Sequence, residues 1–136
     1  MENRKPINVV ALVMWNENQQ ILLAQRPASK GGEWEFPGGK QETGESLEQA
    51  LKREINEELS IEIHIDQQLG VEMVNFQDKT YVIHFFQSYY QGQEIQLTEH
   101  QSFRWFDIND LQYVKVSQGN LNFLNKNLLN KLTNVE

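Results

Sequence analysis

Residues 38–61 read GGKQETGESLEQALKREINEELSI, and this stretch decides the fold that we expect. Its larger part predicts an amphipathic helix over residues 46–59, because apolar residues recur there at helical spacing. Ser46 and Gln49 form a capping box, in which a serine hydroxyl and a glutamine three residues later satisfy free backbone N–H groups of the first turn. The helix is therefore expected to begin at Ser46.

Three carboxylates, Glu54, Glu57 and Glu58, project from one arc of this helix at about 100° per residue, and we call them the helix glutamates. Like charges at these spacings destabilise a helix by roughly a few tenths of a kcal/mol per pair. One reading is a solvated acidic face. Leu47 and Leu51 occupy the same arc earlier in the helix, however, so a core-facing stripe continues as carboxylate. A divalent cation with oxygen ligands is the natural partner of such a cluster.

The spacing of charged and glycine residues across this stretch resembles the signature of the Nudix hydrolases, G-x5-E-x7-R-E-U-x-E-E-x-G-U, where U is apolar. The matching positions are Gly39, Glu45, Arg53, Glu54, Ile55, Glu57, Glu58 and Ile61. The preceding WEFPGGK at residues 34–40 is similar to the MutT branch in particular. Ser60 departs from the signature, because the family has glycine there. If residue 60 is left-handed, serine costs about 1 kcal/mol at that position.

The resemblance implies a hydrolase that cleaves a diphosphate linked to another group, with Mg²⁺ or Mn²⁺ as cofactor. It implies that the helix glutamates hold the metal, with the main-chain carbonyl of Gly38 as a further ligand. Arg53 then orients the carboxylates through Glu45. Glu99 is a candidate extra metal ligand or general base, since the MutT branch has a glutamate in a similar Glu-x-Gln context; its other reading is an ordinary loop residue.

Four residues are candidates for substrate binding. Arg26 and Lys40 are expected to contact phosphates, although both positions also suit ordinary surface residues. Phe36 could flank a base, and core packing is its alternative role. In the MutT branch an asparagine just before the last helix reads an oxidised guanine, and the equivalent here is Gly119 or Asn120. Asn120 could instead cap that helix.

The nucleotide that we expect from this resemblance is 8-oxo-dGTP, hydrolysed to the nucleoside monophosphate and pyrophosphate in sanitation of the nucleotide pool. Alternatives are CTP or 5-methyl-dCTP, since a related subgroup has aspartate at the base-reading position, and ADP-ribose. A non-catalytic nucleotide-binding Nudix module is an alternative of another class. Such modules typically lose the signature glutamates, and all of them are present here. No alternating loop ligands of an EF-hand are visible.

Strands dominate the rest of the chain, which favours an α+β fold over a doubly wound sheet. The resemblance implies a Nudix-type α/β/α sandwich with a mixed central sheet, the signature helix and a C-terminal helix, in a single domain over residues 1–136. Several aromatic residues alternate along the strands and are expected mainly in the core; they are Phe76, Tyr81, Phe85, Phe86 and Tyr89. The expected strands cover residues 7–14, 20–25, 69–76, 80–90 and 101–106, and the last helix residues 120–132.

The composition sets the remaining expectations. The net charge of −7 argues against binding a nucleic acid polymer, which needs a basic surface. Without the charges of the helix glutamates, of Glu45 and of Glu99, the net charge would be −2. Most of the acidic excess therefore belongs to the expected metal site. The longest apolar run is too short to cross a membrane, and no signal peptide or cysteine is visible, so we expect a cytoplasmic protein. The three histidines are too scattered to predict a histidine metal site, and the sequence leaves the oligomeric state open.

Overall fold

The computed structural model describes residues 5–129, without the side chain of Leu129. The strands are β1 (Ile7–Trp15), β2 (Gln20–Gln25), β3 (Trp34–Glu35), β4 (Gly38–Lys40), β5 (Ile65–Phe76), β6 (Lys79–Tyr89) and β7 (Ser102–Asp107). The helices are α1 (Leu47–Leu59) and α2 (Gln118–Phe123). Short 3₁₀ turns form η1 (Ala28–Lys30) and η2 (Ile108–Tyr113), and α2 continues into the π-helical turn η3 (Leu124–Leu129).

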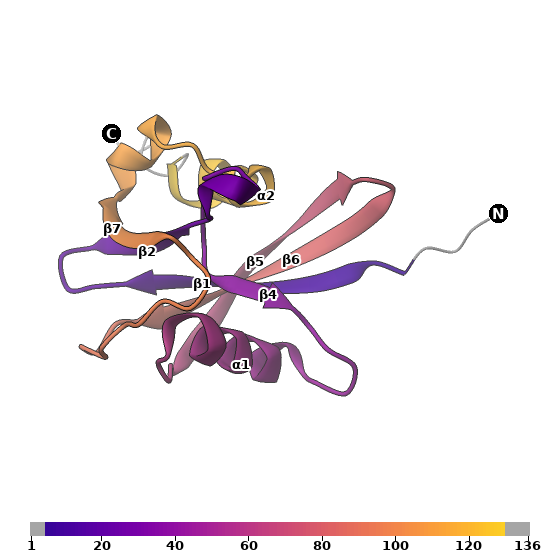
Figure 1. Ribbon diagram of the computed structural model, residues 1–136, viewed down its shortest axis with the longest axis horizontal. Coiled ribbons are helices and arrows are strands. Elements are labelled where there is room, and N and C mark those ends of the chain that lie inside the picture. Colours follow the sequence, from indigo (N-terminus) through magenta and orange to yellow (C-terminus); the bar gives the residue numbers. More distant parts are fainter. Residues whose placement is uncertain (1–4, 130–136) are drawn as a thin grey trace.

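The described strands form one mixed sheet in the order β3-β2-β1-β6-β5, with β4 paired to β1 and β7 paired to β2 (Figure 1). β1 and β6 run parallel along the whole of β1, and the other pairs are antiparallel. β1 changes partner along its length: its first half pairs with β4, and its end pairs with β2. The chain of β4 therefore enters the middle of the sheet, where the signature stretch begins.

Helices cover both faces of this sheet, with α1 on one side and α2 on the other (Figure 1). The apolar run of β1 follows from this arrangement, because a strand that is buried on both faces needs no polar alternation. Val10, Leu12 and Met14 pack in the core on the α1 side. Ala11 and Val13 pack in the core on the α2 side. This architecture is the α/β/α sandwich that the sequence predicts.

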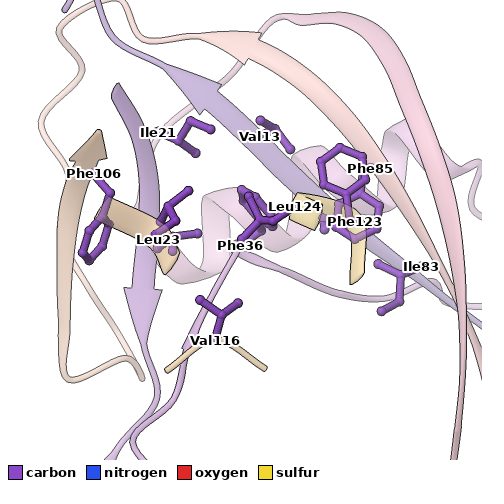
Figure 2. Packing of buried hydrophobic residues seen from close by; sticks show 12 residues of the cluster. Val13, Ile21, Leu23, Phe36, Ile83, Phe85, Phe106, Val116, Phe123 and Leu124 are labelled. Carbon is purple, nitrogen blue, oxygen red and sulfur yellow. The ribbon is translucent and has the colours of Figure 1, made fainter. Parts of the chain in front are cut away.

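Three phenylalanine rings fix the α2 side of the core (Figure 2). Phe85 and Phe123 stack with ring centroids 4.0 Å apart, and Phe36 meets them edge-on at 5.8 and 6.0 Å. The Phe36 side chain is only 3% exposed. The prediction that this ring flanks a substrate base is therefore wrong, and its alternative role in the core holds. The packed ring instead anchors the short segment between β3 and β4.

The bounds of most elements agree with the sequence prediction to within one residue, and α1 has the capping box at Ser46. Strand β5 starts four residues earlier than predicted, and α2 starts two residues earlier, at Gln118. Residues 130–132 of the predicted last helix lie outside the described part of the chain. The predicted core positions of Phe76 and Tyr89 are wrong, since both residues are more than half exposed. Within residues 5–129, no helix is long and apolar enough to span a membrane.

Candidate active site

Two glycines let the start of β4 approach both β1 and α1. A Cβ atom on Gly38 would lie 1.8 Å from the main-chain oxygen of Val10, so no side chain fits there. A Cβ atom on Gly39 would lie 2.2 Å from Oε2 of Glu54. The Gly-Gly pair thus opens the space that the carboxylate of Glu54 fills, and this contact explains why the signature needs glycine before the helix.

One arginine joins the start of the signature stretch to the helix. Arg53 binds Glu45 with two hydrogen bonds, from Nε to Oε2 at 2.6 Å and from Nη2 to Oε1 at 3.0 Å. Its Nη1 donates to Glu54 Oε1 at 2.9 Å and to Glu57 Oε1 at 3.2 Å. Its Nη2 also donates to the main-chain oxygen of Lys40 at 3.0 Å. These contacts use the five N–H donors of a guanidinium, so the plane of Arg53 is fixed from all sides.

The helix glutamates differ strongly in their environment. Burial raises the pKa of Glu58 to about 8, although the His100 ring and the N–H of Gly38 favour the charged form. That N–H donates to Glu58 Oε1 at 3.0 Å. Burial also raises the pKa of Glu54, and Arg53 opposes this shift. Glu57, by contrast, has an exposed side chain. Without a counter-ion, burial therefore favours the protonated form of the Glu58 carboxyl.

A small cavity of about 150 Å³ opens beside Glu58. Its lining residues are Arg26, Pro27, Lys30, Glu35, Glu58, Glu99 and His100. The fold thus brings Arg26 and Glu99, both candidates from the sequence, to the same cavity as Glu58. Lys40 is not among the lining residues, and its side chain is exposed. Cationic and carboxylate side chains share this cavity, which suits a phosphate group that is bound together with a cation.

A histidine in this cavity was not expected from the sequence. His100 Nε2 lies 2.9 Å from Glu35 Oε2, its side chain is 6% exposed, and its Nδ1 is buried without a hydrogen-bond partner among the described residues. Burial lowers the pKa of His100, but the hydrogen bond to Glu35 and the charges of Glu58 and its neighbours outweigh it, so that the net shift is upward. In the sequence, only the position of His100 next to Glu99 could have indicated that His100 lies in this cavity.

The donor set around Glu58 fits a hard divalent cation, because carboxylate and carbonyl oxygens are the ligands that Mg²⁺ prefers. A buried carboxyl that carries a proton is also a position where a cation can replace that proton. Within residues 5–129, however, no group of three or more His, Asp or Glu side chains is already arranged to hold a metal ion.

A second polar contact lies on the other side of the sheet. The Asn120 Oδ1 accepts a hydrogen bond from the main-chain N–H of Phe36 at 2.9 Å, and its Nδ2 donates to Ser117 Oγ at 2.8 Å. Ser117, not Asn120, is the N-cap of α2, so the predicted alternative of Asn120 as a helix cap is wrong. A Cβ atom on Gly119 would lie 2.5 Å from Ile83 Cδ1, so Gly119 faces the sheet. Asn120 is thus the residue that offers polar groups here.

The model of the NUDIX domain family matches residues 4–126, and the chain belongs to the Nudix hydrolases. Over 88 residues it is 38% identical to the 8-oxo-dGTP diphosphatase of Proteus vulgaris, which covers 63% of this chain and 79% of that protein. Over 112 residues it is 38% identical to the CTP pyrophosphohydrolase of Escherichia coli (strain K12), covering 80% of this chain and 82% of that protein.

Among solved structures, the MutT protein from Methanosarcina mazei Go1 has the same fold, with a TM-score of 0.86 over 99% of this chain and 100% of that chain, at 21% identity. The predicted family, its MutT-like character and the sandwich fold are thus confirmed. The chain is a Nudix pyrophosphohydrolase. Hydrolases of this family act on nucleotide derivatives and generally use a divalent metal ion.

Proposed function

We propose that this chain is a Mg²⁺-dependent nucleoside triphosphate pyrophosphohydrolase of the MutT type, with 8-oxo-dGTP as its preferred substrate. The observation that carries the choice of base is the pair of hydrogen bonds at Asn120. The similarity to the 8-oxo-dGTP diphosphatase of Proteus vulgaris supports the same choice.

The main-chain N–H of Phe36 can only donate, so the amide oxygen of Asn120 must face it. After the contacts to Phe36 and Ser117, the Asn120 amide retains one N–H and one oxygen lone pair among the described residues. A base edge that carries an acceptor beside a donor complements this pair. Guanine offers two acceptors, O6 and N7, on that edge. Oxidation at C8 converts N7 into an N–H donor, which creates the complementary pattern.

The catalytic roles rest on the residues around Glu58. The helix glutamates and the Gly38 carbonyl would hold Mg²⁺, with Glu99 as a further ligand or as the general base. When bound, the ion supplies positive charge to the phosphate oxygens and lowers the pKa of a bound water. Arg53 holds Glu45, Glu54 and Glu57 in place, since its N–H groups are all engaged.

The reaction adds water across the bond between the α- and β-phosphates, so that one P–O bond forms and one breaks. A carboxylate takes the proton of the attacking water, and Glu99 or a helix glutamate fills this role. Arg26 lies in the cavity with Glu58 and can neutralise phosphate charge, while Lys40 extends from the end of β4 as a further phosphate contact. The products are the nucleoside monophosphate and pyrophosphate.

Hydrolysis of CTP or 5-methyl-dCTP is the second candidate, because the E. coli CTP pyrophosphohydrolase aligns over 80% of this chain. The related CTP-hydrolysing subgroup is expected to have aspartate at the base-reading position, where this chain has Asn120. A binding role without hydrolysis is less well supported, since the signature glutamates are all present. ADP-ribose is a further alternative among the substrates.

A substrate panel tests the proposal. We would measure kcat/KM with Mg²⁺ for 8-oxo-dGTP, dGTP, dATP, CTP, 5-methyl-dCTP and ADP-ribose; dATP is included because adenine also presents a donor beside an acceptor. We expect 8-oxo-dGTP to exceed dGTP by roughly 10- to 100-fold, the value of a good pair of base contacts. Asn120→Ala should bring this ratio close to one and retain pyrophosphate release from dGTP. Equal values across the panel would reject the choice of base, and no release of pyrophosphate from any compound would reject the activity.

A further inference from the structure

The serine at the start of α2 does not cap its helix. Ser117 is the N-cap residue of α2, but its side chain makes no hydrogen bond to a backbone N–H of the first turn. Ser46, at the same position of α1, makes the complete capping box with Gln49. Serine is favoured at N-caps because its oxygen accepts a backbone N–H. The hydroxyl of Ser117 is therefore free to accept a hydrogen bond from a different donor.

Its partner is the side chain of Asn120. The Oγ of Ser117 lies 2.8 Å from Nδ2 of Asn120, which donates to it. The oxygen of the same amide accepts from the main-chain N–H of Phe36. The amide oxygen and the amide nitrogen of Asn120 are thus each hydrogen-bonded, to Phe36 and to Ser117, which are far apart in the sequence.

The backbone holds these two segments in register. Trp34 forms a parallel bridge with Val116, in which the Trp34 N–H donates to the oxygen of Lys115 at 2.9 Å and the Ser117 N–H donates to the oxygen of Trp34 at 3.0 Å. The phenyl ring of Phe36 is locked in the core. The contact to Phe36 starts from the main chain. The contact to Ser117 starts from the short side chain of a residue whose own N–H is bonded to Trp34, so the direction of the remaining N–H and lone pair of the amide is defined.

We propose that Ser117 is a positioning residue for base selection, which fixes the plane of the Asn120 amide and thereby determines which base edge it accepts. The inference rests on the proposed base-reading role of Asn120. With both ends held, a base that presents an acceptor beside a donor is bound at no cost in amide reorientation. Without the Ser117 hydroxyl, only the contact to Phe36 remains, so the amide is held at its oxygen alone and its plane is less well defined.

The test compares Ser117→Ala and Ser117→Thr with the wild-type protein, and the readout is the ratio of kcat/KM for 8-oxo-dGTP to that for dGTP. We expect Ser117→Ala to lower this ratio about five- to tenfold, the value of one hydrogen bond, through a higher KM for 8-oxo-dGTP. Ser117→Thr keeps the hydroxyl and should restore the ratio. The Tm of Ser117→Ala should stay near that of the wild type, because no backbone N–H loses its cap.

Ser46→Ala is the matched control, since it removes the hydroxyl that does cap a helix. It should lower the Tm and leave the selectivity ratio unchanged. An unchanged ratio in Ser117→Ala, or a ratio that Ser117→Thr does not restore, would overturn the inference.

The outcomes also separate this inference from the proposed function. If the wild-type protein shows no selectivity, or if selectivity survives in Asn120→Ala, the base-reading role of Asn120 fails and the role of Ser117 fails with it. If Asn120→Ala loses selectivity and Ser117→Ala retains it, only the inference about Ser117 fails.

Discussion

Replacing Glu58 by glutamine should reveal the cost of a buried carboxylate. The pKa of Glu58 is raised by burial from 4.5 to about 8, so the folded protein binds this proton more tightly than the unfolded chain. The contribution of Glu58 to the stability of the metal-free protein is then fully present below pH 4.5 and is lost as the pH rises towards 8. The amide that Glu58→Gln introduces does not titrate, and its oxygen can still accept the N–H of Gly38.

The size of the effect follows from the shift, at about 1.4 kcal/mol per pKa unit. Between pH 5 and pH 8, the free energy of unfolding of Glu58→Gln should rise relative to the wild type by about 3 kcal/mol. The assay is denaturant unfolding at several pH values with a chelator present. Glu57→Gln is the matched control, because this side chain is 58% exposed and its replacement removes no buried charge.

Excess Mg²⁺ should reverse the trend, because a bound cation takes the place of the proton. The wild type should then gain stability as the pH rises from 5 to 8, and Glu58→Gln should gain little. A difference between the two proteins that stays constant from pH 5 to pH 8 in the chelator would refute the reasoning, since it would mean that Glu58 titrates alike in the folded and unfolded chains.

Three further substitutions test the geometry of the site. Gly39→Ala should lower the affinity for Mg²⁺, measured by titration calorimetry, at least about tenfold, because the added Cβ would displace the carboxylate of Glu54. An unchanged affinity would show that the contact between Gly39 and Glu54 does not matter for metal binding. Arg53→Lys should lower kcat by roughly 100-fold while KM changes little, since an ammonium cannot reproduce the forked contacts; full activity would contradict its positioning role. Ser60→Gly should raise the free energy of unfolding by about 1 kcal/mol, because residue 60 has a left-handed backbone with a φ of 61°. Denaturant titration measures this change. A lower free energy of unfolding would mean that the lost hydrogen bond from the Ser60 hydroxyl to Gln96 outweighs the relieved strain.

The parts of the fold that could be predicted from sequence are those with local signals. The capping box and the apolar stripe define α1 within 14 residues, and Ser60 has the left-handed backbone that the signature indicates. The start of strand β5 was harder to predict from the sequence, because the pairing register of β5 shifts between Ile65 and Gln67 and between Gln68 and Gly70. Such irregularities break the alternation of polar and apolar residues on which strand prediction depends.

The parts of the site that could not be predicted depend on contacts between distant segments. Glu35 and His100 are 65 residues apart, and nothing local to either residue indicates that they meet. The same holds for the contact of Asn120 with the backbone of Phe36, 84 residues away. A sequence pattern can supply the chemistry of such residues, but their pairing follows only from the order of the strands.

The parallel pairing of β1 with β6 has a consequence for how the protein folds. Trp15 donates to Gln87, 72 residues along the chain, and the whole of β1 pairs with β6 at similar separations. Closing such long loops is slow, and proteins dominated by non-local pairing fold in milliseconds to seconds, by rough order of magnitude. During synthesis the apolar strand β1 therefore lacks one of its pairing partners until β6 has left the ribosome. We expect the rate of folding to be limited by this docking step, and an unprotected β1 to be the segment through which newly made chains associate.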